Sequence, residues 1–216
     1  MSAPLLAPPS HGAPPARGRR GVLAIKFGGT SLGTAARVRL AARRVSALRA
    51  RGWRPVVVVS AAGSTTDRLL EHLGRVTGAP PAREEWRAAL CAREIDRALA
   101  TGEDRSAALL AAALCARGVP AASVRAHEGV LVARGYHGAA TLASLEPGAI
   151  AAALHSGVVP VVSGFQGVRR DGELVTLGRG SSDTTAVFLA AALGAAECHI
   201  ITDVAGVFDA DPRRVP

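Results

Sequence analysis

The chain has 216 residues, of which 49% are hydrophobic and 3% aromatic, and it carries a formal net charge of +9. This length suits one domain, or one domain and a small lobe. The arginines are spread over most of the predicted helices, and aromatic side chains that stack on bases are scarce, so the composition argues against nucleic-acid binding. No apolar run approaches the length of a membrane span.

Cysteine and histidine form no metal-ligand or redox pattern. Cys91, Cys115 and Cys198 lie far apart, which is typical of reduced core cysteines in an intracellular protein, and we expect a cytoplasmic location. Cys198 and His199 are neighbours on a predicted strand, so their side chains point to opposite faces. The sequence therefore predicts no metal site built from protein ligands alone.

Residues 1–20 are rich in Pro, Ala, Gly and Arg and are expected to form a disordered tail. Beyond them, short apolar strands alternate with helical patterns. Strands are predicted at 22–27, 56–60, 119–124, 130–133, 158–163 and 198–202, and helices at 34–51, 82–100, 104–117, 147–157 and 183–193. Thr101-Gly102-Glu103 is expected to separate two helices, and Arg170-Asp171-Gly172 to form a hairpin tip. The alternation predicts an α/β fold, a three-layer αβα sandwich with a mostly parallel central sheet.

The first strand runs directly into two glycines, Gly28 and Gly29, and then into a helix. Such a turn aims free N–H groups and the positive end of the helix dipole at one point, which makes an anion site. Lys26 lies at the mouth of this site and is the only lysine, against 25 arginines. Because an ammonium is a compact point charge and a guanidinium a planar fork, the choice of lysine indicates a chemical role. The alternative is that one lysine persists by chance in an arginine-rich composition.

A second glycine-rich loop, Gly178–Asp183, also opens a helix. Loops that follow parallel strands meet at the carboxyl edge of the sheet, so we expect the two loops to face one space suited to a polyphosphate. Neither loop matches the Walker A or the dinucleotide-binding pattern.

Gly29-Thr30-Ser31-Leu32-Gly33 matches the nucleophile elbow of hydrolases, with Ser31 as the nucleophile. That elbow normally follows a central strand deep in the chain, whereas this one follows the first strand. No oxyanion-loop pattern precedes it, and no histidine is assigned as its base. The sequence therefore disfavours a hydrolase.

Three stretches together resemble the aspartokinases of the amino acid kinase superfamily, and their order and spacing agree from about residue 22 onward. They are Lys26-Phe-Gly-Gly-Thr-Ser31, Ser60-Ala-Ala-Gly-Ser-Thr-Thr66-Asp67, and Thr176–Thr185 continuing to 202–213. The resemblance implies an amino acid kinase fold, related to the Rossmann-like folds. It also implies ATP-dependent phosphorylation of the side-chain carboxylate of L-aspartate to 4-phospho-L-aspartate, the first step towards lysine, threonine and methionine. A carboxylate is already ionised at neutral pH, so the chemistry calls for charge compensation by lysine, helix N-termini and Mg²⁺ rather than for a base.

The resemblance implies that Lys26 stabilises the transferring phosphoryl group and that Asp183 orients Lys26 or the metal. The alternative for Asp183 is a plain helix N-cap. Phosphate and nucleotide contacts are implied for Gly28, Gly29, Ser31, Thr202, Asp203, Phe208 and Arg213. A turn residue is the alternative for Asp203.

The resemblance implies that Arg179 binds an aspartate carboxylate in bidentate fashion and that Glu103 meets the substrate ammonium. Ser60, Thr66 and Ser182 are the other implied substrate contacts. The alternative for Glu103 is a capping carboxylate between two helices.

The chain departs from the family pattern at several points. Ser181 stands where a second glycine is usual and is expected to be strained if that position needs a positive φ, and Phe208 replaces a tyrosine. Catalytic domains of the family continue beyond the point matching Pro216 and supply a second lysine. We therefore expect 21–216 to be a catalytic domain incomplete at its C-terminus, without ACT regulatory domains.

These departures leave several functions open. The chain is an aspartokinase fragment, a short variant completed by a partner chain or a homodimer, or an inactive pseudokinase that binds nucleotide or amino acid. A kinase of another small carboxylate is a further alternative.

Overall fold

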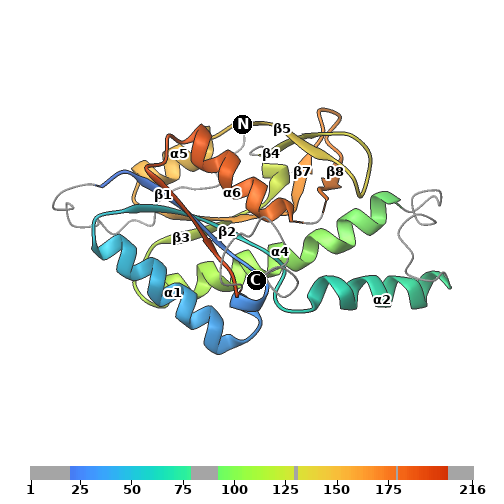
Figure 1. Cartoon of the computed structure of the whole chain (residues 1–216), viewed down its shortest axis with the longest axis horizontal. Coiled ribbons are helices and arrows are strands. Elements are labelled where there is room, and N and C mark those ends of the chain that lie inside the picture. Colours follow the sequence, from blue (N-terminus) through green and yellow to red (C-terminus); the bar gives the residue numbers. More distant parts are fainter. Residues whose placement is uncertain (1–19, 79–91, 129–130, 179, 204–216) are drawn as a thin grey trace, which may run out of the picture.

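The computed structural model describes residues 20–78, 92–128, 131–178 and 180–203 (Figure 1). Its centre is a five-stranded sheet in the order β3-β6-β2-β1-β9, in which every neighbouring pair is parallel. The strands are β1 (Val22–Phe27), β2 (Arg54–Val59), β3 (Ala121–Val124), β6 (Val159–Ser163) and β9 (Glu197–Ile201). The four valines of β2, 56–59, are fully buried, as expected of a central strand covered on both faces.

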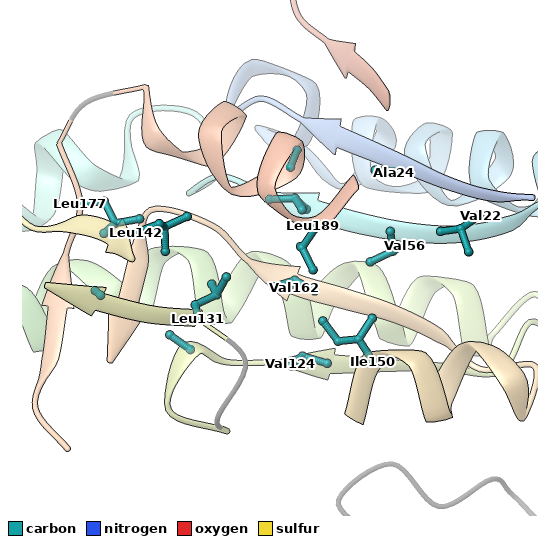
Figure 2. Packing of buried hydrophobic residues seen from close by; sticks show 14 of the residues in the cluster. Val22, Ala24, Val56, Val124, Leu131, Leu142, Ile150, Val162, Leu177 and Leu189 are labelled. Carbon is teal, nitrogen blue, oxygen red and sulfur yellow. The ribbon is translucent and has the colours of Figure 1, made fainter. Parts of the chain in front are cut away.

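Helices cover both faces of this sheet, so the predicted three-layer αβα sandwich is confirmed (Figure 1). On one face, α1 (Ala35–Ala50) and α4 (Ala92–Cys115) bury Val45 and Leu110 against the sheet. On the other face lie α5 (Gly148–His155) and α6 (Ser181–Ala192). Figure 2 shows Ile150 of α5 and Leu189 of α6 packed against this second face. The remaining helix, α2 (Thr65–Thr77), lies beside α4.

A smaller mixed sheet packs on the α6 side and has the order β5-β4-β7-β8. Its strands are β4 (Leu131–Arg134), β5 (Thr141–Leu145), β7 (Gln166–Val168) and β8 (Leu174–Thr176). The predicted hairpin tip is confirmed, because β7 and β8 are antiparallel and Gly172 has a φ of 85°. The β5 strand was not predicted; one half-buried and three exposed residues surround its single buried residue, Leu142, so it lacks a continuous apolar run.

The predicted helix break at Thr101-Gly102-Glu103 is wrong, because α4 continues through it. A glycine inside a helix costs roughly 1 kcal/mol relative to alanine. Here the lack of a side chain allows a close approach: a Cβ at Gly102 would lie 2.9 Å from the Cβ of Ala61. Gly102 therefore serves packing between α4 and the loop after β2.

The expectation of core cysteines is corrected for the two cysteines that the structure describes, whereas Cys91 lies outside the described residues. Cys115 and Cys198 are free but exposed rather than in the core, since one ends α4 and the other lies on β9 at the edge of the described sheet. The predicted disordered tail falls outside the described residues except for Arg20, whose guanidinium lies 5.4 Å from the ring centre of Trp53. None of the described helices is both long and apolar enough to cross a bilayer.

Candidate active site

The loops after the central strands meet at the carboxyl edge of the sheet, as predicted. Gly28, just after β1, donates a backbone hydrogen bond to the carbonyl of Ile201 at 3.1 Å. Gly164, just after β6, donates to the carbonyl of Val59 at 3.0 Å. These bonds join the ends of four strands, so the polar loops that follow them surround one space.

Lys26 and Asp183 form an ion pair in this space, with 2.7 Å between Nζ and Oδ1. The lysine side chain is 11% exposed and the aspartate side chain 49%. Asp183 lies in the first turn of α6, whose N-cap is Gly180 with a φ of 81°, so the alternative of Asp183 as a plain N-cap is wrong. The pair places a positive charge, held by α6, directly beneath the glycine turn.

The turn after β1 depends on glycine for a steric reason. A Cβ at Gly29 would lie 2.6 Å from the carbonyl oxygen of Ala61, and the Gly29 carbonyl accepts a hydrogen bond from Gly63 at 2.8 Å. The first two loops therefore close against each other through their backbones. Ser31 does not form the serine–histidine pair of a hydrolase, because no hydrogen bond among the described residues joins it to a histidine.

A cavity of about 400 Å³ opens beside Ser31, within the size range of small-ligand pockets. It brings Ser31 and Asp203 together, as the sequence predicts. It also includes Arg37 and Arg44 of α1, which sequence analysis did not single out. Their spacing of seven residues places them on one helix face, which was the available signal. The full lining consists of Phe27, Thr30, Ser31, Arg37, Leu40, Ala41, Arg44, Ile201 and Asp203.

Glu103 lies inside α4 and is 3% exposed. Its Oε1 accepts a hydrogen bond from the Ala61 amide at 2.9 Å, whereas its buried Oε2 has no partner among the described residues. Burial raises the pKa of Glu103 to about 7, and the neighbouring charge of Asp104 adds to this rise, while the Ala61 amide opposes it. The alternative of a capping carboxylate between helices is wrong, and the free oxygen marks a place for a hydrogen-bond donor.

The start of α6 supplies two more polar side chains. Ser182 is buried and packs against Gly164, where a Cβ would lie 2.8 Å from the Ser182 Oγ. Ser181 is helical, and its buried Oγ has no partner among the described residues. The expected strain at Ser181 is absent: the positive φ of a non-glycine residue in the described structure occurs at Phe165, at 64°.

The other predicted site residues are half-buried, exposed or outside the described structure. Ser60 and Thr66 are half-buried and flank the loop that contacts α4 at Gly102 and Glu103. Thr202 is exposed, and its hydroxyl lies 3.4 Å from the Asp203 carboxylate. Arg179, Phe208 and Arg213 lie outside the described residues.

Comparison with known proteins agrees with this geometry. The sequence model of the Amino acid kinase family matches residues 21–216. The aspartokinase of Thermus thermophilus is 44% identical over 191 residues, covering 88% of this chain and 45% of that protein. The aspartokinase of Mycobacterium tuberculosis H37Rv is 46% identical over 191 residues, covering 88% of this chain and 43% of its own length. The chain thus spans somewhat less than half the length of these relatives.

Solved structures show the same fold. The aspartate kinase from Synechocystis superposes with a TM-score of 0.70 at 40% identity, covering 90% of this chain and 30% of that one. Aspartokinase III of E. coli, crystallised with aspartate and ADP, gives a TM-score of 0.68 at 28% identity, covering 89% of this chain and 51% of that one.

Proposed function

The chain belongs to the amino acid kinase family, and from this we propose that it transfers the γ-phosphoryl group of ATP to the side-chain carboxylate of L-aspartate. The names of its relatives support this substrate. The observation that carries the proposal is the Lys26–Asp183 ion pair beneath a glycine turn, 2.7 Å between the charged atoms. A buried ammonium at this point compensates charge where two anions must approach.

The reaction needs positioning and charge compensation rather than a base. A carboxylate oxygen of aspartate attacks the γ-phosphorus, and the bond from that phosphorus to the bridging oxygen of ADP breaks, with no proton to remove. Negative charge collects on the transferring group and the leaving oxygen. Lys26 faces that charge, and Asp183 keeps its ammonium in place.

The cavity beside Ser31 is the proposed nucleotide side of the site. Arg37 and Arg44 supply positive charge there, and Ser31 lies on the 3-10 turn η1 (Thr30–Leu32) that follows the glycines. Thr202 and Asp203 border the same region. We propose that Gly28 and Gly29 let the phosphates approach the backbone, with Phe208 and Arg213 completing the nucleotide contacts.

Glu103 is the proposed anchor for the substrate ammonium. Its Oε2 is buried and has no partner among the described residues, so an ammonium donor would satisfy it. Ser60 and Thr66 flank the loop whose Ala61 amide donates a hydrogen bond to Glu103. Ser182 and Arg179 are the other proposed substrate contacts, with Arg179 as the partner of an aspartate carboxylate. In the empty site, burial raises the pKa of Glu103 to about 7. A positively charged amino group bound beside it would favour the ionised carboxylate and lower that pKa.

We include Mg²⁺ in the proposal. Mg²⁺ is usually held by one or two carboxylates together with substrate phosphates. The half-exposed Asp183 fits this role, although no cluster of three or more His, Cys, Asp or Glu side chains occurs in the described part of the chain. Bound Mg²⁺ would neutralise phosphate charge, and this chain's contribution would be the carboxylate that holds it.

A hydroxamate assay with ATP, Mg²⁺ and L-aspartate tests the proposal on the whole chain. We expect aspartyl hydroxamate from the wild type and its loss in Lys26→Met, while Arg43→Met, an exposed change on α1, keeps activity. Nucleotide binding without any product would favour the pseudokinase alternative. A panel of small carboxylates identifies the acceptor, and light scattering on the same sample tests the alternative of completion by a homodimer.

A further inference from the structure

In helix α4, Glu103 is directly followed by another acidic residue, Asp104. Its Oδ1 accepts hydrogen bonds from the Ser163 hydroxyl at 2.8 Å and from the Gln166 amide nitrogen at 3.0 Å. Ser163 and Gln166 are both completely buried. Hydrogen bonds to an ionised acceptor are stronger than those between neutral groups, so this carboxylate is a firm anchor.

The two donors bracket a sharp corner of the chain, Gly164 and Phe165. Phe165 has a φ of 64°, a conformation that a bulky residue keeps only where its surroundings impose it. Gly164 packs against Ser182 so closely that a Cβ there would lie 2.8 Å from the Ser182 Oγ. The corner is therefore held by Asp104 on one side and touches the start of α6 on the other.

We propose that Asp104 is a positioning residue that holds the Ser163–Gln166 corner and thereby sets Ser182 relative to Glu103. Helix α4 then carries both Glu103, the proposed partner of the substrate ammonium, and Asp104, which anchors the Ser163–Gln166 corner. The expected effect on the Michaelis constant for aspartate rests on the proposed function, whereas the expected effect on the order of the start of α6 does not.

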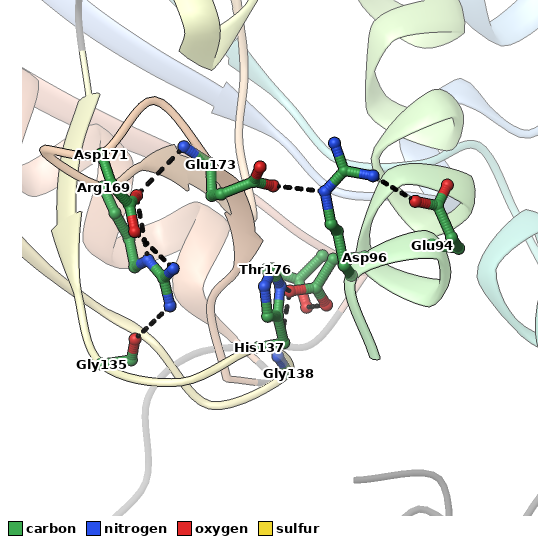
Figure 3. A network of polar contacts seen from close by, with 10 residues as sticks. Glu94, Asp96, Gly135, His137, Gly138, Arg169, Asp171, Glu173 and Thr176 are labelled. Carbon is green, nitrogen blue, oxygen red and sulfur yellow. Dashed lines mark hydrogen bonds and ion pairs between the residues drawn. The ribbon is translucent and has the colours of Figure 1, made fainter. Parts of the chain in front are cut away.

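The strand that pairs with Gln166 has its own anchor, because Thr176 of β8 lies opposite Gln166 and is bound to α4 independently of Asp104, so loss of Asp104 has a local effect. Asp96, two turns earlier in α4, accepts hydrogen bonds from the Thr176 hydroxyl, the Gly138 amide at 3.1 Å and His137 Nδ1 at 2.8 Å (Figure 3). It is 1% exposed. These contacts keep β8 attached to α4 when the corner at Gly164 loosens.

The test compares Asp104→Ala, which removes the acceptor, with Asp104→Asn, which keeps an oxygen for both donors. Ser163→Ala, a smaller change, removes one donor, and Glu94→Ala on the exposed start of α4 is the matched control. Amide hydrogen exchange of the full chain, followed by mass spectrometry, gives protection of residues 180–184 without requiring activity. The Michaelis constants for aspartate and ATP are measured on the same proteins.

In Asp104→Ala we expect about tenfold faster exchange at 180–184, as a loss of one or two net hydrogen bonds predicts. The Michaelis constant for aspartate rises by a similar factor, while kcat and the constant for ATP change little. Ser163→Ala shows a smaller effect, Asp104→Asn falls between the wild type and Asp104→Ala because its oxygen is a neutral acceptor, and Glu94→Ala matches the wild type. Unchanged protection in both Asp104→Ala and Ser163→Ala overturns the inference, and so does an Asn variant that behaves like Ala. Absence of product from the wild type defeats the proposed function, and the exchange data still decide the role of Asp104.

Discussion

Glu103 is buried, and burial disfavours its charged form. The proposed substrate ammonium, however, requires that charged form. The Glu103 carboxylate has one backbone donor and one free oxygen among the described residues, and burial raises its pKa to about 7. A binding site that holds a cation in this way sacrifices stability in the empty protein, since the ionised group is poorly solvated.

The first prediction at this scale concerns stability and pH. The ordinary pKa of 4.5 governs Glu103 in the unfolded chain, and a pKa of about 7 governs it in the folded protein. Between these values the folded state binds more protons, so the free energy of unfolding falls as pH rises from 4.5 to 7, by about 3 kcal/mol in total. Glu103→Gln lacks this decline, and urea unfolding at pH 4 and pH 8 measures it.

We therefore expect Glu103→Gln to be more stable than the wild type at pH 8 and similar to it at pH 4, with aspartate binding lost. Glu71→Gln is a useful control, because Glu71 pairs with Arg75 at the surface, where their side chains are 60% and 71% exposed. Equal pH dependence of wild type and Glu103→Gln would contradict the assigned burial effect.

The second prediction concerns the Lys26 counter-ion. Asp183→Asn leaves a largely buried ammonium without its negative partner. Because Asp183 is half-exposed, we expect a loss of about 1–2 kcal/mol, below the cost for a fully buried pair. Hydroxamate formation should fall at least tenfold, since Lys26 is no longer held. Unfolding by urea and the hydroxamate assay measure the two effects, and unchanged activity would mean that Asp183 does not orient Lys26.

At the scale of elements, α4 links the two halves of the site. It contacts the loop after β2 through Gly102 and Glu103, and the β6–β8 region through Asp96, Ala100 and Asp104. Because α4 is one continuous helix, the distances between these contacts along it are fixed. The site geometry therefore depends on α4 being unbroken.

Two glycine substitutions test this role of α4. Gly102→Ala improves helix propensity but places a Cβ 2.9 Å from the Cβ of Ala61, so we expect a net destabilisation of about 1–2 kcal/mol and weaker aspartate binding. Gly148→Ala at the start of α5 has open space around its Cβ and serves as the matched control. Thermal unfolding compares them, and equal stability of the two variants would show that Ala61 moves aside at no cost.

At the scale of the whole molecule, two hydrophobic clusters lie on opposite faces of the central sheet. The cluster of Figure 2 joins α5, α6 and the small sheet to the central strands, and it supports the start of α6 where the site residues lie. Packing in this cluster therefore helps to hold the site residues at the start of α6 in position.

Removal of core volume tests the contribution of this packing. Leu189 of α6 is fully buried, whereas Leu109 of α4 is 47% exposed. We expect Leu189→Ala to lose about 2–5 kcal/mol in urea unfolding and Leu109→Ala to lose less than 1 kcal/mol. A small effect of Leu189→Ala would mean that the α6 layer contributes little to the fold.

The order of most elements, the parallel sheet, the two glycine turns and the family could be predicted from the sequence, whereas β5 and the continuity of α4 could not. The predicted features follow from local signals: apolar runs of strand length, helical periodicity, and glycines placed directly between a strand and a helix. The lone lysine at the end of the first strand also predicts the position of the candidate site, because its residue type stands out without knowledge of its neighbours in space.

The folded structure is needed to learn which other distant side chains meet. The bracket formed by Asp104 and the two arginines beside Ser31 join segments far apart in the chain, and neither was predicted. Gly102 shows the reason most clearly. A local pattern treats it as a helix breaker, but a neighbouring loop that allows no side chain there makes glycine the fitting residue inside the helix. Close packing between segments distant in sequence overrides local propensity, and the sequence does not reveal those neighbours until the chain is folded.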